Sequence, residues 1–233
     1  MTSIKRMLPA ISLLSWSLVG CGQEAQKAED GPCATVSPAF SVHVQQVLSD
    51  TTGRFFHDYP APAPLPCELL QGLEEAMTDD SVRYHFEHLA QRYDDPRASS
   101  AFAFIRRHND FHIAMALTSH WNPDVRIEGV KAVYNYRRVR PMVCATQSWY
   151  AQLEKQDRQA MRYFVQVLES TPWVINGSEN ATIHGVFIGQ VLHTLDLFAG
   201  TDYCPVDPSR IAVEFTDQGI REALVKWNAI VLK

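Results

Sequence analysis

The sequence contains none of the short motifs that commonly identify an enzyme. It has no glycine-rich phosphate-binding loop, no Gly-x-Ser-x-Gly turn around a serine nucleophile and no His-Glu-x-x-His zinc motif. Each of these motifs places a phosphate, a nucleophile or a metal at a defined point, and without them no residue stands out as a catalytic group. We therefore expect a protein that binds rather than catalyses, and we expect no cofactor.

Basic residues are also few, and they are scattered along the chain. The 233 residues include 21 Lys and Arg against 26 Asp and Glu, a net charge of −5, and no segment concentrates the positive charge. Binding to nucleic acid depends on a basic patch that neutralises phosphates. We therefore expect no nucleic-acid partner.

The strict alternation of polar and apolar residues that marks a β-strand is nowhere sustained. Apolar residues instead recur at helical spacing, beginning with Phe40, Val44, Val47 and Leu48 in residues 37–50. The same spacing predicts helices within residues 67–79, 80–93, 97–120, 123–136, 154–170, 179–200 and 216–233. The predicted fold class is therefore all-α, and the short polar link between the helices at 67–79 and 80–93 predicts an antiparallel pair.

Proline is concentrated in one segment between the first two helices. Pro60, Pro62, Pro64 and Pro66 occupy alternate positions of residues 59–67. Each proline fixes its own φ and lacks an N–H, so this segment suits only an extended, polyproline-like conformation. We interpret it as a spacer.

A single cysteine follows an apolar run near the start of the chain. Residues 1–20 have a basic start at Lys5 and Arg6, an apolar stretch and a small residue, Gly20, which is the pattern of a secretory signal too short to span a membrane. The letters LVGC at 18–21 resemble the lipobox of bacterial lipoproteins. The resemblance implies cleavage before Cys21 and attachment of several acyl chains, such as palmitate, to that cysteine, because one chain alone holds weakly. An ordinary signal peptide with a chance cysteine is the alternative.

The resemblance also implies a location and a domain organisation. A lipoprotein is anchored in the bacterial cell envelope, and Gly22 after the cysteine favours the outer membrane, facing the periplasm or the cell surface. Residues 22–32 have almost no large apolar side chain, which predicts that residues 21–36 form the lipidated cysteine and a flexible tether. Residues 37–233 then form one helical domain. Loss of Lys5 and Arg6 with the acid-free signal takes the net charge from −5 to −7.

The remaining cysteines fit an exported protein. Cys33, Cys67, Cys144 and Cys204 are an even number in a chain that should reach an oxidising compartment. Three connectivities are open, and we favour Cys33 with Cys67 and Cys144 with Cys204 because neighbours in sequence meet readily in a fold of local contacts. Buried thiols are the alternative.

The segment 116–136 looks like one HEAT repeat, a two-helix unit of stacked arrays. Its Asp124, Val125 and Arg126 match the family's residues at the start of the second helix, and Gly129 matches its small residue. The resemblance implies a structural role, in which the acid faces a helix N-terminus, the arginine reaches a neighbouring turn and the glycine permits close helix packing. Other segments match loosely, so the predicted array is either a HEAT-like α-solenoid or an irregular helical bundle.

Histidines form the only constellation that could carry chemistry. His85 and His88 lie three residues apart, and His108 and His112 lie four apart. Such spacings place imidazoles on one helix face, as zinc ligation requires, and zinc-bound water is a hydrolytic nucleophile. The simpler interpretation, which we favour, is that these histidines lie on solvated helix faces and that no metal is bound.

Aromatic residues gather in the middle of the chain. Trp121, Tyr134, Trp149 and Tyr150 are candidates for a partner-binding surface, since aromatic residues are enriched at protein interfaces. Packing in the core is the alternative for each of them.

These observations predict a membrane-anchored, disulfide-stapled helical domain. We expect it to bind another envelope protein as a non-catalytic scaffold or adaptor, because stacked helices present a long surface and a lipid anchor raises the local concentration of what they hold. The first alternative is a metal-dependent envelope hydrolase that uses His85, His88, His108 and His112. A second is a carrier of a lipophilic small molecule between its helices.

Overall fold

The described part of the chain is built from helices alone. The computed structural model describes residues 35–49, 62–91, 110–139, 147–173, 181–205 and 215–232, and in these ranges it has eight helices and no strand. The helices are α1 (Pro38–Ser49), α2 (Cys67–Ala76), α3 (Asp80–Gln91), α5 (Phe111–Leu117), α6 (Pro123–Val139), α7 (Gln147–Ser170), α8 (Ala181–Ala199) and α9 (Asp217–Val231). The predicted all-α fold class is confirmed.

The chain divides into two units, residues 1–31 and residues 32–233, and every described residue belongs to the second unit. The predicted signal peptide at 1–20 and most of the predicted tether at 21–36 therefore lie outside the described residues. Val36, the last residue of that tether, is buried against the core. None of the described helices is long and apolar enough to cross a membrane.

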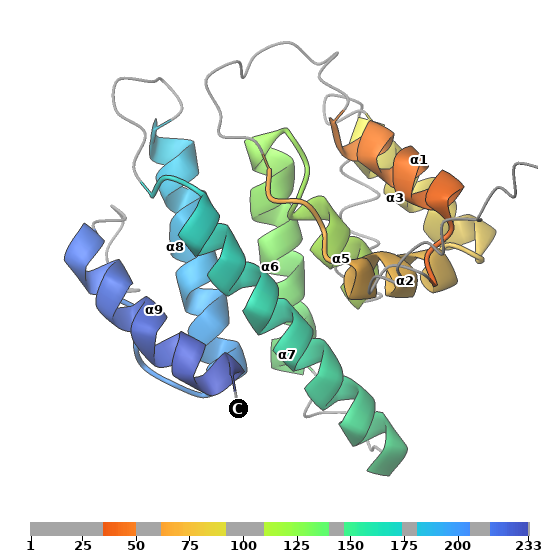
Figure 1. Cartoon of the computed structure of the whole chain (residues 1–233). Coiled ribbons are helices and arrows are strands. Elements are labelled where there is room, and N and C mark those ends of the chain that lie inside the picture. Colours follow the sequence, from red (N-terminus) through yellow and green to blue (C-terminus); the bar gives the residue numbers. More distant parts are fainter. Residues whose placement is uncertain are drawn as a thin grey trace, which may run out of the picture. The chain divides into compact units, whose positions relative to one another are not determined.

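Helix α8 is the centre of one group of helices, and α5 is the centre of another (Figure 1). Helix α8 packs on α6, α7 and α9, whereas the short helix α5 packs on α2 and α6. Helix α1 packs on α3. Two pairs of helices that are consecutive in the sequence, α5 with α6 and α7 with α8, pack against each other. Helix α2, in contrast, packs mainly on α5 and not on the next helix, α3. The antiparallel pairing predicted for residues 67–79 and 80–93 is therefore not the main contact of either helix.

Polar side chains start several of these helices. Asp110 Oδ1 accepts the N–H of Ile113 over 2.8 Å at α5, and Thr216 Oγ1 accepts the N–H of Gly219 over 3.1 Å at α9. Asn122 Oδ1 accepts the N–H of Asp124 over 2.9 Å ahead of α6. These side chains satisfy N–H groups that have no partner within the helix itself.

The core is apolar and continuous along the helices. Its largest fully buried side chains are Leu69, Leu73, Phe86, Leu89, Ile113, Met115, Leu117, Tyr163, Phe164, Leu168, Ile188 and Trp227. They come from α2, α3, α5, α7, α8 and α9, so helices from both groups share it. Burial of such residues is the main favourable term in folding.

The turn before α6, where the sequence resembles a HEAT repeat, is tightly packed. A β-carbon on Gly129 would lie 2.8 Å from the Thr118 nitrogen, so α5 and α6 approach closely only because that position is glycine. Arg126 is buried, donates from Nε to the His120 carbonyl in its own turn, and has its guanidinium carbon 5.8 Å from the centroid of the Phe187 ring. Asn122 supplies the cap we expected from Asp124, whose pKa is raised by burial and by Glu128.

The proline-rich connector is held by hydrogen bonds to two helical segments. Its described residues, 62–66, end at Pro66, whose φ of −59° and ψ of 148° are those of a polyproline helix. The Ala63 carbonyl accepts hydrogen bonds from Ser119 Oγ over 2.9 Å and from the Tyr163 hydroxyl over 3.4 Å. The two hydroxyls also bond to each other, and burial raises the pKa of Tyr163. The connector is thus fastened to the α5–α6 turn and to α7.

Removing the Tyr163 hydroxyl should loosen this attachment. We expect Tyr163→Phe to lower the free energy of unfolding by about 1 kcal/mol, because the buried hydroxyl of Ser119 and the Ala63 carbonyl each lose a partner. Urea denaturation measures the effect. Tyr84→Phe is the matched control, since Tyr84 is 51% exposed, and it should change stability little. Equal effects of the two substitutions would contradict the attachment.

Candidate functional site

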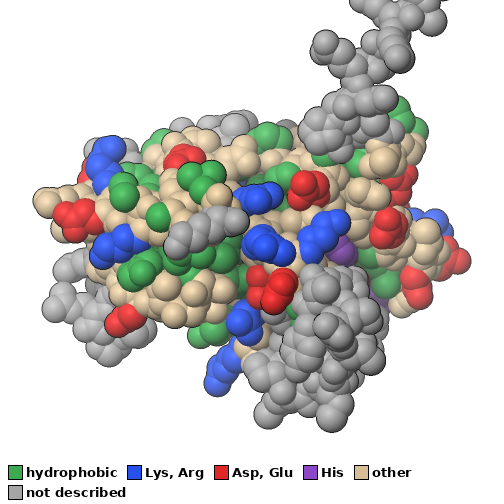
Figure 2. All heavy atoms as spheres, turned by 60° about the horizontal axis from the view of Figure 1, so that its bottom comes forward, with side chains coloured by type: hydrophobic (Ala, Val, Ile, Leu, Met, Phe, Trp, Pro, Cys, Tyr) green, Lys and Arg blue, Asp and Glu red, His purple; other side chains and the backbone are tan. Residues whose placement is uncertain are grey.

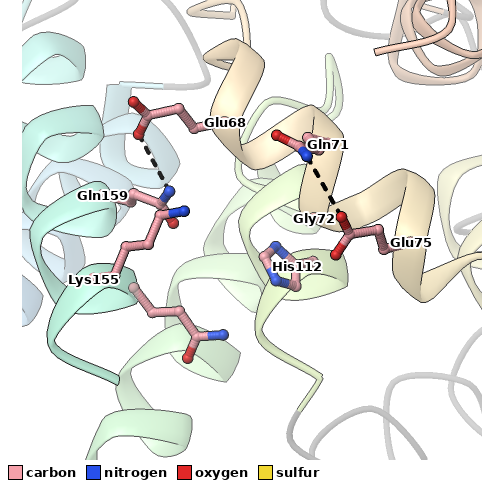
Figure 3. Close-up of a pocket in the computed structure, with 8 residues that line it drawn as sticks. Glu68, Gln71, Gly72, Glu75, His112, Lys155 and Gln159 are labelled. Atoms are coloured by element: carbon pink, nitrogen blue, oxygen red, sulfur yellow. Dashed lines mark hydrogen bonds between the residues drawn. The ribbon is translucent and has the colours of Figure 1, made fainter. Parts of the chain in front are cut away.

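A polar pocket lies between α2, α5 and α7. It has a volume of about 130 Å³ and is lined by Glu68, Gln71, Gly72, Glu75, His112, Lys155, Gln156 and Gln159. Figure 3 shows Glu68, Lys155 and Gln159 on one side and Gln71, Glu75 and His112 on the other. Three helices far apart in sequence thus converge on one small space.

His112 reaches the pocket because the facing residue of α2 is glycine. A β-carbon built on Gly72 would lie 2.0 Å from Cε1 of the imidazole, which is far inside van der Waals contact. The ring therefore packs directly on the backbone of α2. Its Nδ1 atom is buried and has no hydrogen-bond partner among the described residues.

The His112 imidazole is held in its neutral form. Burial lowers the pKa of His112, and Lys155 lowers it further, while Asp110 and Glu75 act in the opposite direction. Desolvation is the largest of these influences, because a charged imidazole loses its hydration when it is covered. The floor of the pocket thus carries no positive charge at neutral pH.

Side-chain amides share the pocket with the charged groups. Gln159 Nε2 donates to Glu68 Oε2 over 3.2 Å, and Gln71 Nε2 donates to Glu75 Oε1 over 3.5 Å. Gln156 Oε1 accepts from the Tyr136 hydroxyl over 2.6 Å. Gln156 and Gln159 are each 8% exposed, whereas Glu68, Glu75 and Lys155 are exposed. The pocket therefore has a floor of neutral polar groups and a charged rim.

A second pocket adjoins the first along the same two helices. It has a volume of about 230 Å³ and is lined by Pro66, Glu68, Leu69, Gln159, Arg162, Tyr163 and Gln166. Glu68 and Gln159, which hydrogen-bond to each other, line both pockets. We call the two pockets together the α2–α7 groove. One half is polar, and the other is partly apolar because the half-buried Pro66 lines it, with the fully buried Leu69 and Tyr163 behind.

The histidines considered as candidate metal ligands are distributed over different helices. His85 and His88 lie on α3, His112 lies on α5, and His108 lies outside the described residues. The Tyr84 ring stacks on His88 with ring centroids 4.2 Å apart. Within the described ranges no group of three or more His, Cys, Asp or Glu residues could hold a metal ion. On the face in Figure 2, histidine occupies only small areas among acidic and basic side chains.

The aromatic residues proposed for partner binding are only partly described. Trp121 and Tyr134 are half-buried. The main-chain N–H of Trp121 donates a hydrogen bond to the Leu48 carbonyl over 3.1 Å. Trp149 and Tyr150 belong to the first turn of α7, but their side chains lie outside the described part. A common surface of these four residues stays a prediction.

The cysteines are likewise described in part. Cys67 is the first residue of α2 and is disulfide-bonded. The N–H of Cys204 donates to Asp196 Oδ2 over 2.7 Å. Cys21, Cys33 and Cys144 lie outside the described residues, so the favoured pairings and the lipidation of Cys21 stay predictions.

Comparison with known proteins adds no identification. No family model matches the chain, no curated protein matches it, and no solved structure matches it. The resemblances to lipoproteins and to HEAT repeats therefore rest on the residues that carry them.

Sequence reasoning singled out only one residue of the pocket, His112, as an alternative metal ligand, and favoured a place for it on a solvated helix face. It missed the glutamates and glutamines of α2 and α7. The spacing of these residues does not indicate a binding site, because charged and amide residues three or four positions apart are also typical of a helix face exposed to solvent. These glutamates and glutamines line one pocket only because α2 and α7 both pack near α5.

The contact between Gly72 and His112 can be tested by adding a single methyl group. We expect Gly72→Ala to destabilise the protein by about 1–3 kcal/mol, because the imidazole must leave the floor of the pocket. In the His112→Ala background, where no imidazole meets the added methyl group, Gly72→Ala should cause no such loss of stability. Gly185→Ala in α8 is the control, since its β-carbon would meet nothing within 4 Å, and it should stabilise the helix by up to about 1 kcal/mol. Thermal unfolding of these variants and the unaltered protein measures the differences. Equal gains from both single variants would rule out the close contact.

Proposed function

We propose that the chain is a lipid-anchored protein of the bacterial cell envelope that binds another protein and catalyses nothing. Cys21 supplies the anchor, the segment between it and Val36, which packs on the core, is the tether, and the helical domain is the scaffold or adaptor. Anchoring keeps the binding surface beside the membrane and raises the local concentration of the bound partner.

The observation that carries the proposal is the α2–α7 groove. It runs over several turns of α7, since Lys155, Gln159, Arg162 and Gln166 line it in succession. A groove along helices, with a polar half and a partly apolar half, suits a segment of a partner protein. The charged rim provides orientation, and the half-buried Pro66 provides apolar contact.

The location rests on the basic start, the apolar run and the LVGC letters before Gly22. The HEAT-like interpretation of the helical array is supported by the glycine at 129 and by Arg126, which ties the turn before α6 to α8. The metal-dependent hydrolase, with His85, His88, His108 and His112, remains the alternative. Zinc at one equivalent in the purified protein would favour it.

The membrane anchor has a simple test. We expect Cys21→Ser to move the protein from the membrane fraction to the soluble fraction after cell lysis, because the acyl chains have no other site of attachment in the proposal. Immunoblotting of the separated fractions measures the change. Ala34→Ser, a small substitution elsewhere in the tether, should leave the protein in the membrane fraction. Retention of the Cys21→Ser protein in the membrane would contradict the anchor.

Partner binding in the groove can be tested by cross-linking in intact cells. A photoreactive amino acid replaces Gln71 or Gln166, both of which line the groove and are exposed. We expect one discrete adduct from these positions, because a bound partner segment lies against them. Mass spectrometry identifies the partner.

Gln218 on α9 is the matched control, since it is an exposed glutamine away from the groove, and it should give no such adduct. Adducts from Trp121 or Tyr134 but none from the groove would keep partner binding and move its surface to the aromatic residues. The absence of a discrete adduct at both groove positions and at both aromatic positions would overturn the proposal.

A further inference from the structure

We infer that the polar half of the α2–α7 groove recognises the free amino terminus of a peptide chain. The inference rests on the proposed function, in which the groove binds a protein, and it names the part of that protein that is recognised. Every peptide chain with a free amino terminus begins with one ammonium group. A main-chain carbonyl and the N–H of the next residue lie directly beside it. The pocket offers a complement to each of these groups.

The charges that line the pocket complement a single cation. Glu68 and Glu75 are seven residues apart on α2, about 10 Å along the helix axis, so their carboxylates flank the pocket lengthwise. Each carboxylate has one oxygen in contact with a glutamine, which leaves the other for a ligand. Lys155 is the one cationic side chain lining the described pocket, and the imidazole is neutral. The net charge is therefore −1, which one ammonium group balances.

The buried amides complement a peptide group. Gln156 uses its Oε1 atom for the Tyr136 hydroxyl, so its Nε2 donors remain for a ligand. Gln159 uses Nε2 for Glu68, so its Oε1 acceptor remains. The two side chains are one helical turn apart and nearly buried. A donor and an acceptor so placed match the C=O and N–H of one main-chain amide.

A lysine side chain from the partner fits this arrangement poorly. Its ammonium lies at the end of four methylene groups, far from its own peptide amide, whereas the ammonium of an amino terminus is attached to the same carbon as the carbonyl. The volume of about 130 Å³ is small beside the roughly 300–1,000 Å³ typical of pockets for drug-sized ligands. Of the two, the amino terminus is the one that brings a cation and a peptide group together in so small a space.

The adjoining pocket then takes the next part of the chain. Because Glu75 lines only the polar pocket and Glu68 lines both pockets, the peptide runs from Glu75 past Glu68 into the partly apolar half. An apolar side chain at the second position would contact Pro66, the half-buried apolar residue of this pocket. Arg162 at the far pocket can bind a carbonyl oxygen further along the chain.

The test uses short peptides and the purified full-length protein in detergent. The probe is alanyl-leucyl-alanine amide, which has a free amino group and no carboxylate. Three comparison compounds are its N-acetylated form, N-acetyl-alanyl-lysyl-alanine amide and free L-alanine. Titration calorimetry measures their dissociation constants. We expect the free-amine peptide to bind at least tenfold more tightly than each comparison compound.

Variants assign the effect to the pocket. Glu75→Gln and Glu68→Gln should each weaken binding of the free-amine peptide about tenfold. Glu222→Gln on α9 is the matched control, since Gln218 contacts Glu222 as Gln71 contacts Glu75, and it should leave binding unchanged. Circular dichroism confirms that each variant is folded.

Several outcomes would overturn the inference. Equal binding of the acetylated peptide would exclude recognition of the amino group, and tighter binding of the lysine peptide would assign the pocket to a side chain. Equal binding of L-alanine would make it a site for a free amino acid, and no binding of any probe would also refute it. If cross-links form from the groove while the peptides fail to bind, only this inference falls. If the peptides bind but no cross-link forms from the groove in cells, the proposal that the groove binds a protein partner is contradicted.

Discussion

The arrangement of this protein depends on how closely other helices approach the backbone of α5. Helix α5 is only seven residues long, and all but one of its side chains are buried. On one side α6 comes so near that a β-carbon at Gly129 would collide with the backbone at Thr118, and on the other side His112 of α5 lies directly on Gly72 of α2. Because atoms in a packed core cannot overlap, glycine at these two positions permits α2 and α6 to pack on opposite sides of the short helix α5.

The groove is a consequence of this arrangement. Helix α2 makes its extensive contact with α5 and meets α7 through longer side chains, such as the pair of Glu68 and Gln159. Space therefore remains between α2 and α7 on either side of that pair, and polar side chains line it. The first turn of α2 is held in turn by the disulfide at Cys67 and by the connector that Ser119 and Tyr163 fasten at Ala63. The wall of the groove is thus braced at the end that both pockets share.

The electrostatics of the groove favour recognition of a small charged group in a fixed orientation. The charged side chains lie at the rim, where water screens them, and the neutral amides and imidazole lie below, where hydrogen bonds count for more. Rim charges attract and orient a ligand, whereas buried donors and acceptors discriminate between ligands that pair with them and ligands that do not. A charged rim that attracts a ligand and a buried polar floor that selects it suit a site that binds a small charged group.

The sequence by itself determined the helical character of the described chain. Apolar residues at helical spacing, polar caps such as Asn122 and Thr216, and a proline-rich connector are local features, and each acts through neighbours within a few residues. The lipobox-like start is also a local pattern, and it stays a prediction. Only the tertiary structure decided that α2 packs on α5 rather than chiefly on α3, and that Gln156 and Gln159 face Glu68 and Glu75 across a pocket. The physical reason is that a polar helix face has the same spacing whether it meets water or another helix, so its partner depends on contacts between residues that are distant in the chain.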